Sequence, residues 1–184
     1  SAVLKGLPVG GPYDIELAAG GESLQVSDVL VGDVWLLGGQ SNMQGCGLLT
    51  QPRLPVEDSV RAFYMDDRWA PAADPIHNMW ACVDPVHVTL CGGIRPAKPP
   101  SYWGACPGPA FGLEMRRQTG VPQGLVACGH GGTTMSQWDP AKRKLGGASL
   151  YGALVRRLVK NGGRVAGVLW YQGCSDANPA NAPL

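Results

Sequence analysis

The sequence predicts an α/β fold in which a parallel sheet carries helices on both faces. Three apolar runs of strand length lie at 34–37, 124–128 and 165–171. Each run contains β-branched or aromatic residues and is followed by a loop that contains glycine, as is typical of buried strands. A helical pattern separates the last two runs, and alternation of strand and helix indicates a parallel sheet.

Length and composition support a packed globular protein. The chain has 184 residues, of which 45% are hydrophobic and 16% charged, enough for one ordinary domain with its own core. The formal net charge is +1, so we expect no nucleic acid or membrane surface as a partner. No apolar stretch approaches the roughly 18–20 residues that span a bilayer. Six cysteines favour a secreted, periplasmic or other oxidising compartment.

The first elements expected along the chain form a hairpin. Residues 13–17 alternate between polar and apolar, Gly20-Gly21 makes a turn, and 24–26 alternate again. Residues 1–27 are therefore predicted to be an antiparallel hairpin that leads into the strand at 34–37. Such a hairpin needs a larger sheet to lean on.

The stretch from 45 to 107 contains one clear strand, at 60–65, followed by an insertion rich in proline and cysteine at about 66–107. Long irregular passages inside compact domains are usually lids or binding loops that contacts or cross-links hold in place. Four cysteines, at 46, 82, 91 and 106, are the candidates for such cross-links.

The second half of the chain alternates helix and strand. A helix is predicted over 109–118, because a proline lies in its first turn and a basic pair near its end. The strand at 124–128 runs into a glycine-rich loop. Residues 150–160 then have the apolar spacing of an amphipathic helix, ended by Asn161-Gly162-Gly163. The strand at 165–171 follows.

Three loops, beginning at Gly38, Gly129 and Gln172, follow these three strands. Since the carboxyl ends of parallel strands share one edge of a sheet, the loops should converge on one crevice. Ser41 stands in the first loop as a candidate nucleophile. Acyl transfer also needs hydrogen-bond donors for the developing oxyanion, and Gly131 and Gln172 can supply a backbone N–H and a side-chain amide.

These loops carry a family resemblance. The segment Gly39-Gln40-Ser41-Asn42-Met43, the Gly131-Gly132-Thr133 loop with Trp138 behind it, and Trp170-Tyr171-Gln172-Gly173 resemble, in order, the blocks of sialate O-acetylesterases. These enzymes are SGNH hydrolases, with the acetylxylan-esterase-like carbohydrate esterases as relatives. The turn at 6–13 resembles the passage that joins a β domain to their catalytic domain.

The resemblance implies a three-layer α/β/α, flavodoxin-like fold and a serine esterase without a cofactor or a metal. Ser41 would be the nucleophile, and the oxyanion hole would combine the Ser41 backbone with Gly131 and Gln172, with Gly132 as the alternative to Gly131. Residues 1–27 would be the remnant of an N-terminal β domain, and 28–184 the SGNH domain.

The sequence departs from the family pattern in its C-terminal part. The family's general base is a histidine in an Asp-x-x-His block, which does not occur in these 184 residues. Cys174 stands where the family usually has glutamate. The last strand and helix of the fold are also missing, so we expect a C-terminal fragment or a second chain to supply the histidine and aspartate.

Other interpretations of single residues remain open. His130, in the second glycine-rich loop, is a candidate for an internal base. A zinc site built from His77, His87, Cys82 and Cys91 matches no familiar ligand spacing. Met43 occupies the last glycine position of the G-x-S-x-G elbow, which argues against an ordinary α/β-hydrolase. Trp138 is expected in the core, and Tyr102 and Trp103 are candidates for stacking on a sugar.

The sequence thus predicts a carbohydrate O-acetylesterase that acts on acetylated sugars of the sialic acid or xylan type. Two alternatives remain at this stage. One is a carbohydrate-binding or assembly subunit that kept the fold and lost the base. The other is an SGNH esterase that acts on lipid or aryl esters.

Overall fold

The computed structural model describes residues 4–49 and 52–177. Its central sheet has five strands, in the order β6 (Trp69–Pro71), β5 (Val60–Phe63), β8 (Gln123–Ala127), β3 (Asp33–Gly39) and β9 (Gly167–Tyr171). The last four strands are parallel to one another, and β6 pairs with β5 in the antiparallel direction. The predicted α/β class with a mostly parallel sheet is confirmed.

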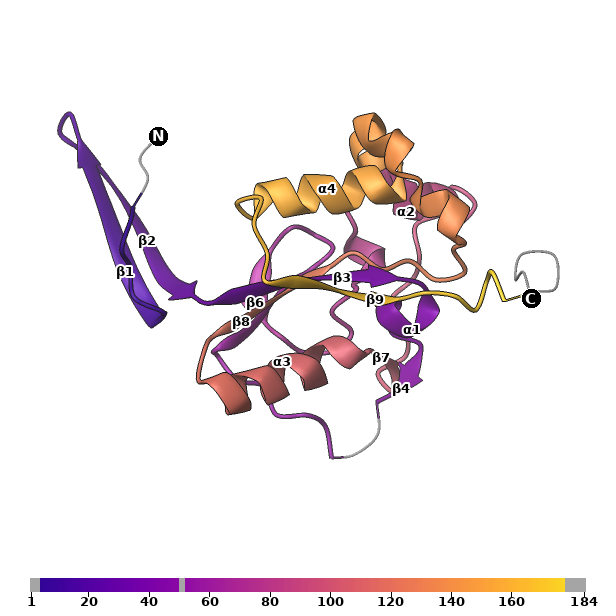
Figure 1. Ribbon diagram of the computed structural model, residues 1–184, viewed down its shortest axis with the longest axis horizontal. Coiled ribbons are helices and arrows are strands. Elements are labelled where there is room, and N and C mark those ends of the chain that lie inside the picture. Colours follow the sequence, from indigo (N-terminus) through magenta and orange to yellow (C-terminus); the bar gives the residue numbers. More distant parts are fainter. Residues whose placement is uncertain (1–3, 50–51, 178–184) are drawn as a thin grey trace.

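Helices cover both faces of this sheet, as Figure 1 shows. Helix α4 (Leu150–Lys160) lies on one face and α3 (Pro107–Thr119) on the other. The two faces have separate cores, because neighbouring side chains of a strand point in opposite directions. Leu36 packs in the cluster that includes residues of α4, while Leu37 packs in the cluster that includes residues of α3.

Several shorter elements lie outside the sheet. The turn after β3 is helix α1 (Ser41–Gln44), and β4 (Gly47–Leu48) pairs with β7 (Trp103–Ala105). Helix α2 (Pro85–Leu90) begins with a proline at its first position, where the missing N–H costs nothing. The 3₁₀ turns are Met79–Ala81, Met135–Trp138 and Pro140–Ala148.

The insertion at 66–107 is more regular than predicted, since it contains β6, α2, β7 and a 3₁₀ turn. The predicted cross-links are absent: all six cysteines lie among the described residues, and all six are free thiols. Ion pairs hold the insertion instead. Arg156 on α4 binds both Asp67 and Asp84 at 2.7 and 2.6 Å.

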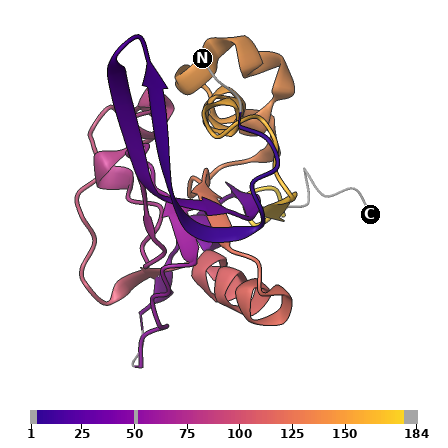
Figure 2. The same cartoon turned by 90° about the vertical axis from the view of Figure 1, so that its left-hand side faces the viewer.

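The predicted hairpin is present but stands apart from the sheet. Strands β1 (Gly10–Ala19) and β2 (Glu22–Val31) pair only with each other and are longer than predicted, with β2 continuing past residue 27. Figure 1 shows the hairpin projecting from the rest of the molecule, and in Figure 2 the hairpin faces the viewer. The expectation that it leans on a larger sheet is wrong for the described residues, and Leu24 stays 60% exposed.

Strand β9 was expected to be buried, but it is an edge strand. Only its inner edge is paired, with β3. Val168, Trp170 and Tyr171 are all exposed as a result. The apolar run predicted the strand correctly, yet it could not show that no described element covers the strand. In the part of the chain that the structure describes, no helix is long and apolar enough to cross a bilayer.

Candidate active site

Ser41 stands where the sequence predicted, at the carboxyl end of β3 in the first turn of α1. The turn requires glycine before it. Gly39 has φ +132°, and a Cβ added there would lie 2.2 Å from the Tyr171 carbonyl oxygen. The chain can therefore leave the sheet at this point only with a residue that lacks a side chain, and this exit places Ser41 half-buried at the edge of the sheet.

The second loop lies directly beside the first. The pairing of β8 with β3 continues past the strand, because the His130 N–H donates to the Gly39 carbonyl oxygen at 3.0 Å. This bond carries Gly131 to Ser41: a Cβ added to Gly131 would lie 3.7 Å from both Cα and Cβ of the serine. The predicted approach of Ser41 and Gly131 is present, whereas a Cβ on Gly132 would meet no atom within 4 Å.

Gln172, the third predicted site residue, links the third loop to the second. Its Nε2 donates to the Thr133 carbonyl oxygen at 3.1 Å and to the Asp176 carboxylate. Thr133 is itself held by the indole N–H of Trp138, which is 3% exposed, so that tryptophan is a core residue as expected. In the described structure, the hydrogen bonds of Gln172 thus join two loops to each other.

Gln40 links the first loop to the third, and the sequence reasoning missed it. Its side chain is 3% exposed. The Oε1 atom accepts the backbone N–H groups of Gly173 and Ser175 at 3.2 and 3.0 Å. Because a buried amide with two such bonds is costly to displace, Gln40 fixes the first loop against the third.

Gln44 and Asp176 were also missed. Gln44 Oε1 accepts the Gly131 N–H at 2.5 Å, and Asp176 accepts the Met135 N–H at 3.0 Å. One signal was available for Gln44, because it follows Ser41 by three residues, a spacing that places two side chains on one face of a helix.

The hydrogen-bond donors expected to form an oxyanion hole therefore differ in whether they already bind an acceptor. The Ser41 N–H, at the first position of α1, has no hydrogen-bond acceptor among residues 4–49 and 52–177. Gly131 lies beside Ser41 and Gln172 binds the loop of Thr133, but the N–H groups of both residues bind acceptors of the chain itself. Their role as oxyanion donors stays a prediction.

All three histidines lie among the described residues, and none of them accepts a hydrogen bond from Ser41. His130 shares a 3.0 Å contact between Nδ1 atoms with His87. Burial lowers the pKa of His130 to about 4 and that of His77 to about 3, where the charge of Arg157 adds to the effect. The pKa of His87 is also well below its usual value, through burial and then through His130. These imidazoles are neutral near pH 7.

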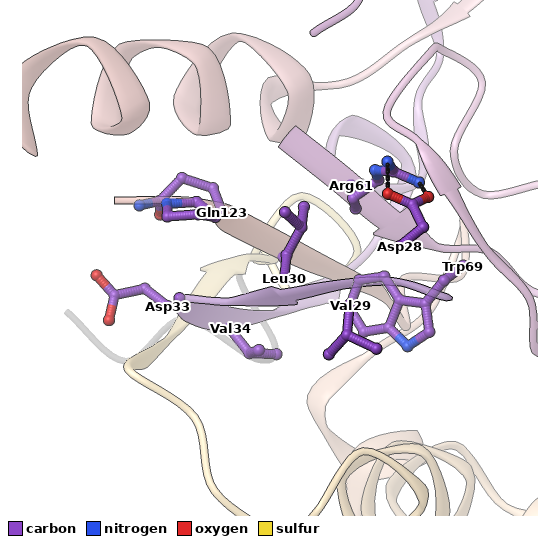
Figure 3. A pocket seen from close by; sticks show the side chains of 11 residues that line it. Asp28, Val29, Leu30, Asp33, Val34, Arg61, Trp69 and Gln123 are labelled. Carbon is purple, nitrogen blue, oxygen red and sulfur yellow. Dashed lines mark hydrogen bonds and ion pairs between the residues drawn. The ribbon is translucent and has the colours of Figure 1, made fainter. Parts of the chain in front are cut away.

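The zinc site considered for His77, His87, Cys82 and Cys91 is not formed. Within the described part of the chain, no group of three or more His, Cys, Asp or Glu side chains could hold a metal ion. A cavity of about 300 Å³ does exist, lined by residues that include the Asp28–Arg61 ion pair and Trp69 (Figure 3). It lies at the amino ends of β3 and β8, at the opposite edge of the sheet from Ser41.

Comparisons with known proteins identify the family. A family model described as "Carbohydrate esterase, sialic acid-specific acetylesterase" matches residues 31–183. A probable carbohydrate esterase of Arabidopsis thaliana is 29% identical over 78% of this chain and 54% of its own length. Human sialate O-acetylesterase is 30% identical over 96% of this chain and 38% of its own length.

Solved structures give the same result. A protein from Arabidopsis thaliana superimposes with a TM-score of 0.57 at 27% identity, over 80% of this chain and 59% of that one. A carbohydrate acetylesterase from Xanthomonas citri also has a TM-score of 0.57, at 28% identity, over 97% and 41%. The chain spans about half the length of the curated relatives it matches, or less. Since the family model covers most of its residues, the chain belongs to the carbohydrate esterase family of sialic acid-specific acetylesterases.

Proposed function

We propose that this chain carries the nucleophile and part of the oxyanion hole of a carbohydrate O-acetylesterase. The observation that carries the proposal is the approach of Gly131 to Ser41 at the carboxyl edge of the sheet. Two relatives are named for closely related activities, one as a sialate O-acetylesterase and one as a carbohydrate acetylesterase. Acetylated sugars of the sialic acid or xylan type are therefore the proposed substrates.

The proposed reaction is acyl transfer through the serine. Ser41 Oγ attacks the acetyl carbonyl carbon, and the developing oxyanion accepts hydrogen bonds, at about 3 Å, from the backbone N–H groups of Ser41 and Gly131 and from the side-chain amide of Gln172. The sugar hydroxyl leaves with a proton, and water then releases acetate from the acyl-enzyme. A neutral Ser41 hydroxyl is a weak nucleophile, so a general base must take its proton.

That base is proposed to come from a histidine of an Asp-x-x-His block outside these 184 residues, on a C-terminal segment or a second chain. The support is that His77, His87 and His130 are buried, with two of them paired to each other. A secreted or periplasmic location also stays a proposal. It was inferred from the six cysteines, which are free thiols in the structure.

Replacement of the serine tests the function. In the natural protein, Ser41→Ala should lower acetate release from O-acetylated sialic acid and from acetylated xylan by about a thousandfold or more, since the attacking atom is removed. Ser23→Ala, on the exposed hairpin, should leave the rate unchanged. Acetate is measured by coupled assay, and circular dichroism checks that both variants fold.

Activity that survives in a folded Ser41→Ala variant would rule out the serine mechanism. A natural protein that binds these sugars and never releases acetate would instead favour the carbohydrate-binding alternative. Hydrolysis of aryl or lipid esters alone would favour the remaining alternative, an SGNH esterase that acts on such esters.

A further inference from the structure

The side chain of Gln44 lies where the loop that carries Ser41 meets the loop that carries Gly131. Its Oε1 accepts the Gly131 N–H at 2.5 Å. A Cβ added to Gly131 would lie 3.1 Å from this oxygen and 3.7 Å from Cα and Cβ of Ser41. Gln44 and Ser41 therefore approach Gly131 from the same side.

The oxygen that Gly131 binds here has the chemistry of a substrate oxygen. An amide carbonyl and an ester carbonyl are both neutral acceptors that present lone pairs to an N–H group. Gly131 has one backbone N–H, which forms one short bond at a time. An acetyl oxygen that binds this N–H must first displace Gln44 Oε1.

We propose that Gln44 is a gate for the oxyanion position: in the resting site its amide oxygen occupies the Gly131 N–H, and substrate binds by exchanging its acetyl oxygen for that amide oxygen. This inference rests on the proposed function, because it concerns the acetyl group of that reaction. The gate keeps the donor satisfied between turnovers, at the expense of affinity for the ester.

The expected size of the effect follows from the value of one hydrogen bond. A neutral hydrogen bond contributes about 0.5–1.5 kcal/mol net, which corresponds to about a two- to tenfold change in affinity. Gln44→Met keeps the length of the side chain and removes the acceptor. It should lower KM by about two- to tenfold and leave kcat nearly unchanged.

Gln44→Glu should act in the opposite direction. Its carboxylate accepts the Gly131 N–H more strongly than an amide does and repels the developing oxyanion, so KM should rise and kcat should fall. Gln44→Ala is the second acceptor-free variant, in case the methionine packs badly. Gln25→Met, on the exposed hairpin, is the matched control and should change neither constant.

A binding measurement decides the question without catalysis. The amide signal of Gly131 is followed by ¹⁵N NMR during titration with acetate, the reaction product. Half-saturation should occur at about two- to tenfold lower acetate in Gln44→Met than in the wild type, and at higher acetate in Gln44→Glu.

The gate is overturned if acetate binds no more tightly to Gln44→Met and Gln44→Ala than to the wild type. It is also overturned if the Gly131 signal of none of these proteins responds to acetate. An equal loss of kcat in both acceptor-free variants overturns it too, because that loss would make Gln44 a required support of the loop. The proposed function is decided separately by Ser41→Ala, whose result does not alter the acetate titration.

Discussion

His77, His87 and His130 form a buried neutral cluster beneath the candidate site. Both ring nitrogens of His77 and the Nε2 of His87 lack hydrogen-bond partners among the described residues. A Cβ added to Gly129 would lie 3.2 Å from His77 Nε2, so the cluster contacts the loop that carries Gly131. Burying unpaired imidazole nitrogens is costly, and protonating them in place would cost more.

The histidine cluster predicts acid sensitivity. Folded pKa values of about 4 for His130 and about 3 for His77 lie below the unfolded value of about 6.5. The unfolded chain therefore binds protons first, and stability that is complete above about pH 6.5 is lost as the pH falls toward 4. The free energy of unfolding, measured with urea, should fall by about 1.4 kcal/mol per pH unit for each histidine.

The variant His77→Leu should reduce this slope by the contribution of one histidine, because the leucine side chain does not bind a proton. A slope equal to that of the wild type between pH 6 and 4 would show that His77 takes up its proton in the folded state.

The sequence predicted the approach of Ser41 to Gly131 because backbone geometry decides it, while the catalytic roles of both residues stay predictions. Ser41 and Gly131 follow neighbouring parallel strands, so the pattern of strands was enough to bring them together. Gln40 and Gln44 were missed because their roles depend on which way a long amide side chain turns and on which loop it meets. No local spacing contains that information.

At the scale of single elements, α4 shows both the strength and the limit of periodicity. The apolar spacing predicted its bounds correctly, at Leu150–Lys160. Yet Val159, part of the predicted apolar stripe, is 62% exposed, while Arg157 is 0% exposed. The buried guanidinium donates to the carbonyl oxygens of Phe63 and Tyr64 at 2.8 and 2.6 Å and to Asp67 at 2.7 Å.

Asp67 is the acidic residue that binds the basic side chains of α4. It accepts hydrogen bonds from Arg156, Arg157 and Lys160. Burial alone would raise its pKa, but hydrogen bonds from Arg156 and Lys160, together with the arginine charges, hold that pKa at about 2. The carboxylate stays charged down to that pH, and it pins α4 to the segment after β5.

Asp67→Asn should destabilise the protein by about 3–5 kcal/mol, because it leaves the buried Arg157 without a carboxylate. Asparagine tolerates the left-handed backbone at this position, where φ is 62°, so strain would not explain the loss. Urea unfolding at pH 7 measures it. Glu114→Gln is the control: it removes a carboxylate from the exposed pair with Arg117, which solvent screens, so the free energy of unfolding should hardly change. Equal losses in both variants would contradict the role of the network.

Element length explains which elements the sequence predicted. Strand β8, helix α3 and helix α4 are long enough to show a run or a period. Strand β6 has three residues and α2 has six, so neither repeats a pattern, and their proline-rich surroundings resemble irregular chain. Ion pairs from α4 hold this region in place, and such contacts between distant segments are invisible to a local pattern.

At the scale of the whole molecule, the end of β2 coincides with the start of the family match. The family model begins at residue 31, and β2 ends at Val31. The domain boundary that the sequence predicts after residue 27 stays a prediction. The three-layer body was predictable from alternating strand and helix, whereas the independence of the hairpin was not, since its alternation resembles that of any half-buried strand.

Removal of residues 1–27 should leave the body of the protein intact. Strand β1 pairs with no described strand except β2, so the free energy of unfolding should change by less than about 1 kcal/mol, as for surface changes. All six tryptophans lie beyond residue 27, and their fluorescence during urea unfolding reports on the body alone. A loss of several kcal/mol would mean that the hairpin supports the sheet.

The free thiols have a practical consequence. Cys174 is exposed on the loop that begins with Gln172, two residues beyond that side chain, whereas Cys82, Cys106 and Cys128 are buried. Thiol reagents react according to exposure, so a maleimide dye added to a Cys91→Ser variant would attach first at Cys174, on the third loop. Under the proposed function, the emission of that dye would then report, in real time, when a sugar arrives and when it leaves.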